Sequence, residues 1–95
     1  MPAYVILDIN VTDPDAYETY RARSGATVEQ HGGRYLVRGG DPETVEGDWA
    51  PTRIVVLEFP DRERARAWHE SAEYQEILPI REANANSVAV LVTGT

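Results

Sequence analysis

Four short segments of the chain are rich in apolar and β-branched residues, and this pattern predicts four β-strands. We expect the strands at residues 3–11, 34–38, 53–59 and 87–93. Successive side chains of a strand point to opposite faces of its sheet, so Tyr35 and Val37 are expected to share a face. In segments 3–11 and 53–59 both faces carry apolar side chains. Both faces of the predicted sheet are therefore expected to be covered.

Segments with the sequence features of helices lie between the predicted strands. Asp13 and Pro14 are typical of a helix start, and the helix is expected to run to about His31 and to end at Gly32-Gly33. A second helix is predicted over 62–70. Further helical turns are predicted over 71–85, interrupted at Pro79. The segment 39–52 is rich in Gly, Pro and acidic residues and predicts a long loop.

The predicted order β-α-β-β-α-β gives an α+β fold of the ferredoxin-like type, formed by residues 1–95 as a single domain. Right-handed connections place both helices on one face of a four-stranded antiparallel sheet. The other face is also apolar, so it needs a covering partner. A second copy of the chain is the simplest candidate, and we expect a homodimer.

Composition removes several chemistries. The 95 residues carry a net charge of −7, all nine basic residues are Arg, and Lys and Cys are absent. This excludes disulfides, a thiol nucleophile, a thiolate metal site, a lysine Schiff base and a phosphate-binding loop that needs lysine. The acidic balance disfavours nucleic acid and anionic membranes as partners. No apolar run approaches the length of a membrane span, and we expect a cytoplasmic protein.

The signature pieces Gly32-Gly33, Arg38-Gly39-Gly40, Glu46-Gly47, Glu58-Phe59 and Ala67-Trp68, together with Tyr74 and Arg81, resemble the family named domain of unknown function 1330. The resemblance covers almost the whole chain. It implies a dimeric α/β barrel, in which two ferredoxin-like protomers pair their sheets. That superfamily includes cofactor-independent monooxygenases, lactone isomerases, haem-degrading enzymes and small ligand-binding proteins. The family itself carries no assigned reaction, so the resemblance leaves the chemistry open.

Arg38 and Glu58 are the first candidates for a site, because each places a charge inside a predicted strand. The two strands are neighbours in the expected sheet, which would bring the side chains within reach. In one interpretation Arg38 binds an anion and Glu58 acts as a general base or orienting carboxylate. In the other, which we favour, they form a structural ion pair.

The first predicted helix carries a stripe of polar aromatic and hydroxyl side chains: Tyr17, Tyr20, Ser24, Thr27 or Val28, and His31. Such a stripe suits a pocket wall between helix and sheet. The alternative is that the tyrosines fill the core and His31 only caps the helix end.

Trp68 is expected on the apolar face of the second helix, as core or as a wall of the pocket. Its neighbour His69 departs from the family pattern and inherits no role. Haem binding is disfavoured because Trp68 and His69 are adjacent, unlike in the haem-degrading relatives. The acidic loop 39–52 lacks the spacing of a calcium site. It is expected either to act as a lid, with Glu46 and Trp49 facing the pocket, or to clasp a dimer.

These observations predict a homodimer that binds a small organic molecule, such as an organic anion, between helices and sheet, without metal or organic cofactor. The sequence does not decide whether the protein is an enzyme. One hypothesis is isomerase-like or monooxygenase-like proton transfer. A non-catalytic dimerisation module is the alternative. A cavity of roughly 300 Å³ would favour a small-molecule site, and a filled interior would favour the non-catalytic dimerisation module.

Overall fold

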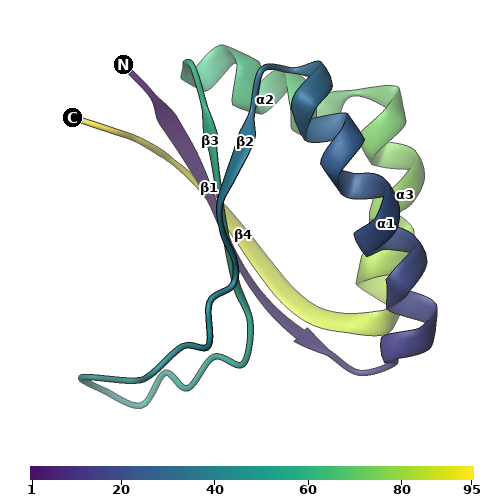
Figure 1. The fold of residues 1–95 in the computed structure, drawn as a ribbon, viewed down its shortest axis with the longest axis vertical. Coiled ribbons are helices and arrows are strands. Elements are labelled where there is room, and N and C mark those ends of the chain that lie inside the picture. Colours follow the sequence, from purple (N-terminus) through teal and green to yellow (C-terminus); the bar gives the residue numbers. More distant parts are fainter.

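The computed structural model describes all 95 residues as a four-stranded sheet with three helices packed on one face (Figure 1). In chain order the elements are β1 (Ala3–Val11), α1 (Pro14–Gln30), β2 (Arg34–Gly39), β3 (Ile54–Phe59), α2 (Arg62–Glu70), α3 (Ala72–Asn84) and β4 (Ala85–Thr93). No helix is both long enough and apolar enough to cross a membrane.

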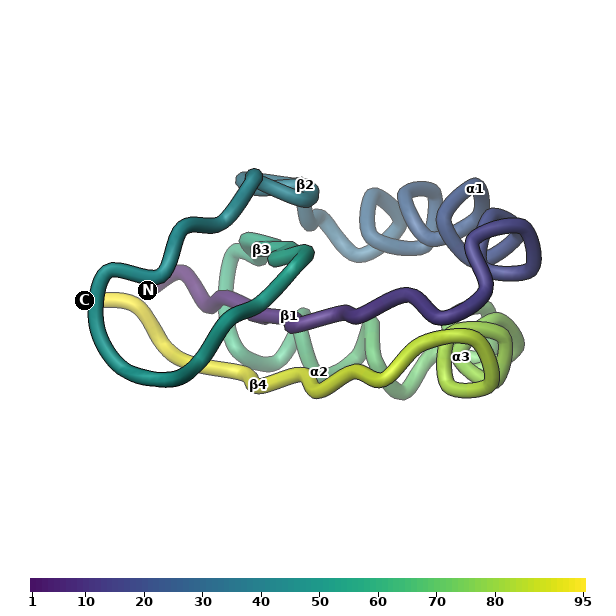
Figure 2. The backbone as a smooth tube through the Cα atoms, turned by 90° about the horizontal axis from the view of Figure 1, so that it is seen from below, coloured from purple at the N-terminus to yellow at the C-terminus, as the bar shows by residue number.

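The strands lie in the order β2-β3-β1-β4, and every neighbouring pair is antiparallel. Figure 2 shows the strands side by side, with β2 and β4 at the two edges. This confirms the ferredoxin-like α+β prediction, including the single helix layer.

Side-chain caps define where the helices begin. The Asp13 carboxylate accepts from the backbone N–H of Ala16 at 3.2 Å, and the Asp61 carboxylate accepts from that of Arg64 at 2.8 Å. The expected interruption at Pro79 was wrong, because α3 runs through that residue. The break lies earlier, at Ser71, whose hydroxyl accepts from the N–H of Tyr74 at 3.2 Å and starts a new helix.

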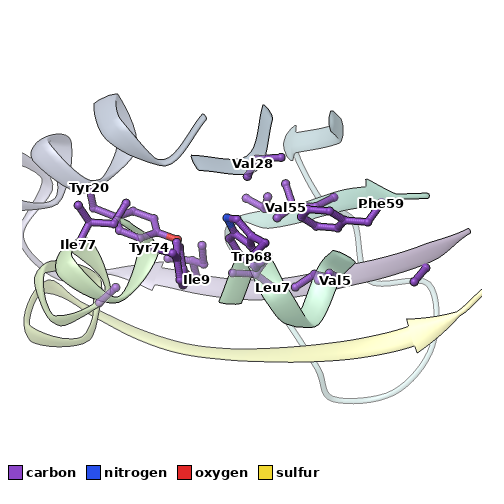
Figure 3. Close-up of a cluster of buried hydrophobic side chains, with 14 of the residues drawn as sticks. Val5, Leu7, Ile9, Tyr20, Val28, Val55, Phe59, Trp68, Tyr74 and Ile77 are labelled. Atoms are coloured by element: carbon purple, nitrogen blue, oxygen red, sulfur yellow. The ribbon is translucent and has the colours of Figure 1, made fainter. Parts of the chain in front are cut away.

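The core lies between the helix layer and one face of the sheet. Alternate residues of β1 and β3 point into it, among them Leu7, Ile9 and Leu57. Figure 3 shows Trp68 of α2 at the centre of this layer, with Phe59 to one side and Tyr74 to the other. The ring centroids of Trp68 and Tyr74 lie 4.2 Å apart, and Trp68, Tyr74 and Phe59 are the three largest fully buried side chains.

A β-bulge in β2 changes which residues share a face. Arg34 pairs with Glu58 and Tyr35 with Leu57, but the register shifts before Val37 pairs with Val56. The extra residue, Leu36, reverses the alternation beyond it. The expectation that Tyr35 and Val37 share a face was therefore wrong: Tyr35 faces the helices and Val37 faces away from them.

The second face of the sheet carries no helix, and we call it the open face. It holds half-buried apolar side chains on β1 and β3 and exposed valines on β4. Val88, Val90 and Val92 are 65%, 53% and 39% exposed. β4 is an edge strand without any charged residue, whereas the edge strand β2 carries two arginines and a bulge. Charges and bulges protect an edge from pairing, so only the β4 edge is unprotected.

Candidate ligand-binding site

A small cavity lies between α1 and the sheet. Its volume is about 20 Å³, which is room for about one water molecule. The lining combines apolar residues from the core with polar residues near the surface: Leu7, Ile9, Tyr17, Tyr20, Arg21, Ser24, Tyr35, Arg38, Arg53, Val55, Leu57 and Trp68.

Three of the nine arginines converge on this cavity from different elements. Arg21 extends from α1 and forms an exposed ion pair with Glu18. Arg38 extends from β2, and its guanidinium carbon lies 3.8 Å from the centroid of the Tyr35 ring. Arg53 precedes β3, and its Nε atom is buried without a hydrogen-bond partner. Neither Arg38 nor Arg53 has a carboxylate within ion-pair distance.

The polar groups of the cavity are strongly biased towards hydrogen-bond donors. Its lining contains no carboxylate and no imidazole. Burial raises the pKa values of the Tyr17 and Tyr20 hydroxyls, only partly offset by the nearby guanidinium groups of Arg53 and Arg81. These hydroxyls therefore stay protonated near neutral pH. The arrangement suits a group that accepts hydrogen bonds and carries negative charge.

Behind Tyr20 lies a buried cluster between α1 and α3. The hydroxyls of Tyr20 and Tyr74 are 2.8 Å apart, and Nη1 of Arg81 donates to Tyr74 at 2.9 Å and to Tyr20 at 3.4 Å. Arg81 is 6% exposed, and its Nε has no partner. A cation is thus buried with hydroxyl partners and no carboxylate, which adds to the positive potential at the inner end of the cavity.

A chain of hydrogen bonds orients the remaining wall. Trp68 Nε1 donates to Thr27 Oγ1 at 3.0 Å, and Thr27 Oγ1 donates to the carbonyl of Ser24 at 2.6 Å. The Ser24 hydroxyl lies 2.9 Å from that of Tyr35. Ser24 also holds its hydroxyl 3.4 Å from the Arg21 carbonyl. This chain fixes the tryptophan ring and the Tyr35 ring on which Arg38 stacks.

The structure brings four of the predicted site residues together and leaves three elsewhere. Arg38, Tyr17, Tyr20 and Trp68 line the one cavity. The predicted proximity of Arg38 and Glu58 was wrong, because the antiparallel register places Arg34 opposite Glu58 and Arg38 opposite Val55. The bulge also turns Arg38 towards the helices, whereas Glu58 lies on the open face. Nε of Arg34 donates to Oε1 of Glu58 instead, at 2.8 Å.

His31 and Glu46 also lie away from the cavity. His31 is the C-terminal cap residue of α1, and its Nδ1 lies 3.1 Å from the Thr27 carbonyl. Glu46 lies exposed in the loop between β2 and β3. That loop is attached to the open-face side, where Trp49 Nε1 donates to Oδ2 of Asp8 at 2.7 Å. Within one chain it is therefore no lid over the cavity.

Sequence reasoning missed three cationic residues of this region: Arg21, Arg53 and Arg81. The signal for Arg53 was present, since it stands two residues before the buried Val55 and so points to the same face. The signal for Arg81 was its helical spacing from Tyr74 and Ile77, which are both buried.

The sheet order and the single helix layer define a ferredoxin-like α+β protein. The chain belongs to the family described as domain of unknown function (DUF1330), whose model matches residues 2–95. No match was found among curated proteins.

Solved structures with the same fold share little sequence with this chain. RPA0582 of Rhodopseudomonas palustris, a protein of unknown function, superposes with a TM-score of 0.81 at 18% identity, over 99% of this chain and 82% of that one. A dimeric ferredoxin-like protein of unknown function from Jannaschia sp. CCS1 gives 0.72 at 12% identity, over 99% and 100%. SnoaB of Streptomyces nogalater, a cofactor-independent oxygenase, gives 0.65 at 15% identity, over 99% and 93%. At these identities the similarity establishes the fold.

Proposed function

We propose that this protein is a homodimer and that each protomer binds a small organic anion at the arginine-lined cavity between α1 and the sheet. The binding proposal is supported by the arginines that line the cavity in a chain of net charge −7: Arg38 and Arg53 form no ion pair, and Arg21 pairs with the exposed Glu18. The lining itself has no carboxylate. Buried cations are normally paired, and the Nε of Arg53 is buried without a partner. A carboxylate or similar anion supplies the missing acceptor.

The size of the cavity limits how such a ligand sits. Pockets that enclose a drug-sized ligand usually measure at least roughly 300 Å³, and this one measures about 20 Å³. The anionic head group therefore enters between Arg38 and Arg53, and the body of the ligand lies towards the surface. Arg38 is exposed and Tyr35 is half-buried, so we expect these two side chains to move when the ligand enters.

The same dimensions favour binding over catalysis. Proton abstraction needs a base within hydrogen-bond reach of the substrate, and the cavity lining offers only cations and protonated hydroxyls. The rival function is a non-catalytic dimerisation module without any ligand, and a cavity of about 20 Å³ favours that rival over an enzyme.

Homodimerisation is supported by the open face. Its exposed valines on β4 and the half-buried Ile6 and Val56 form an apolar surface that a monomer would leave in water. The uncharged β4 edge borders this surface. A protein of the same fold from Jannaschia is described as dimeric. Light scattering at micromolar concentration tests this part: twice the chain mass of 10.6 kDa is expected, and a monomer would contradict it.

The binding proposal is tested by thermal unfolding with sodium benzoate, compared with neutral benzamide and with sodium chloride at equal concentration. Benzoate should raise the melting temperature, because a ligand that binds only the folded state stabilises it. Arg38→Gln and Arg53→Gln should each weaken benzoate binding about tenfold, the usual effect of losing one charged hydrogen bond.

Arg64→Gln on α2 is the matched control, because it removes the same charge from an exposed position outside the cavity lining. It should leave the benzoate response unchanged. Equal responses of all three variants, or equal stabilisation by benzoate and sodium chloride, would overturn the anion site and favour the dimerisation module.

A further inference from the structure

A second, larger hollow lies on the helix side of the sheet, between α2 and the edge strand β4. We call it the α2–β4 groove, and its volume is about 500 Å³. Its lining is largely apolar: Val5, Ala65 and Trp68 form the floor, and β4 forms one wall with Ala89, Leu91 and the strand edge at Val90. Its polar residues are Arg62, Arg66, His69 and Glu70, so the rim is mainly basic.

The basic side chains of this rim have no carboxylate partner within the chain. Arg62 Nη1 donates to the Thr93 hydroxyl at 2.8 Å, and neither Arg62 nor Arg66 forms an ion pair. Apolar floor and basic rim together suit an acidic segment that carries apolar side chains.

The chain itself contains such a segment, the loop of residues 40–53 between β2 and β3. It holds Asp41, Glu43, Glu46 and Asp48, and its only basic residue is Arg53 at the end that joins β3. Val45 in this loop is 84% exposed and Trp49 is 60% exposed. Large apolar side chains in an acidic, projecting loop mark a contact surface.

Hydrogen bonds hold this loop in one shape and on the open-face side of the sheet. The Thr44 hydroxyl donates to the Trp49 carbonyl at 2.5 Å, and Trp49 is bonded in turn to Asp8 of β1. In Figures 1 and 2 the loop leaves the ends of β2 and β3 and projects away from the helix layer. The α2–β4 groove is on the opposite side of the sheet, so a loop in this position does not fill the groove of its own chain.

We propose that the acidic loop 40–53 of one protomer docks into the α2–β4 groove of the other, with Val45 on the apolar floor and Glu43 and Glu46 facing Arg62 and Arg66. This inference rests on the proposed homodimer and specifies one contact between its two protomers. The uncharged β4 edge forms one wall of the groove and also borders the open face. A partner on the open face therefore needs only to extend past this edge to reach the groove.

Cysteine cross-linking tests the contact directly, because the chain has no cysteine of its own. In the double variant Val45→Cys/Ala89→Cys, mild oxidation should produce a covalent dimer. The single variants and Val45→Cys/Ala22→Cys, which places the second thiol on an exposed site of α1, should stay uncrosslinked. All substituted positions are exposed, so folding should be retained.

Charge reversal gives an independent readout. Arg62→Glu/Arg66→Glu and Glu43→Arg/Glu46→Arg should each raise the dissociation constant of the dimer about tenfold. An equimolar mixture of the two variants should recover tight association, because both loop–groove contacts of the mixed dimer pair opposite charges.

The outcomes separate this inference from the proposed homodimer. A dimer by light scattering with no specific cross-link, and with unchanged dissociation constants, would overturn the loop contact and leave the homodimer in place. A disulfide within one chain would show that the loop fills its own groove. A monomer under all conditions would overturn both proposals.

Discussion

The guanidinium of Arg81 donates to the hydroxyl of Tyr74 over 2.9 Å in the core between α1 and α3, and no carboxylate accompanies the pair. Tyr20 completes the cluster as a second, weaker acceptor at 3.4 Å. Removing a hydroxyl here leaves a buried cation with one poor partner, and the loss of a partner for a buried polar group is costly.

Tyr74→Phe should therefore lower the free energy of unfolding by about 1–3 kcal/mol. Tyr4→Phe is the matched control, since the Tyr4 hydroxyl makes no hydrogen bond within the chain and should change stability by less than about 0.5 kcal/mol. Urea unfolding of both variants measures the difference. Equal stability of the two variants would show that Arg81 does not depend on Tyr74.

Stability should fall at alkaline pH because of three buried tyrosines. Burial raises the pKa of Tyr17, Tyr20 and Tyr74 above the ordinary value of 10.0. Their contribution is complete below the unfolded-state pKa. As the pH rises past it, the unfolded chain loses protons that the folded chain keeps, so stability declines.

Urea unfolding between about pH 9 and about pH 11 measures this decline, to which each tyrosine adds up to about 1.4 kcal/mol per pH unit. Tyr20→Phe should reduce the slope of this decline by up to about 1.4 kcal/mol per pH unit, because one titrating group is removed. A slope that does not respond to the substitution would contradict the assignment.

Two glycines should respond in opposite directions to the same substitution. A Cβ on Gly33 would lie 2.5 Å from Phe59 Cε1 and 2.8 Å from Val28 Cγ1, so Gly33→Ala overpacks the core and should cost about 1–3 kcal/mol. A Cβ on Gly25, inside α1, meets nothing closer than 3.7 Å. Gly25→Ala should therefore raise stability by about 0.5–1 kcal/mol. Calorimetric melting measures the change in stability of both variants. Changes in the same direction, or a gain for Gly33→Ala with a loss for Gly25→Ala, would contradict this packing.

The ion pair of Arg34 and Glu58 should be structural and of small effect. The Arg34 side chain is 70% exposed, and exposed pairs contribute at most about 1 kcal/mol. Glu58→Gln should therefore leave both the melting temperature and its response to benzoate almost unchanged. A lost benzoate response in this variant would restore Glu58 to the site and contradict the assignment of the open face.

Much of the fold could be predicted because local signals agree along the chain. β1 is recovered at its exact bounds from apolar alternation, and the starts of α1 and α2 from their aspartate caps. The bulge at Leu36 could not be predicted, since an extra residue in a strand leaves no mark in a pattern of single residues. The register of β2 against β3, which pairs Arg34 rather than Arg38 with Glu58, was equally beyond the reach of the sequence pattern.

The site was only partly predictable for a related reason. The tyrosine stripe of α1 could be recognised because helical spacing is a local property, but Tyr17 and Tyr20 belong to the hydrophobic core and border a cavity of only about 20 Å³. His31 is the cap of the helix, as in the alternative interpretation of the stripe. Arg21, Arg38 and Arg53 meet only when the bulge and the β2–β3 connection place them, and no local pattern encodes that meeting.

Native mass spectrometry of the purified protein, before and after addition of benzoate, tests the central claim most directly. We expect a dimer that carries one small anion per chain, either retained from the cell or taken up as benzoate, and that binds it about tenfold more weakly in Arg53→Gln but not in Arg64→Gln. A dimer that stays free of any anion at saturating benzoate, or one that binds it equally in both variants, would contradict the arginine-lined site.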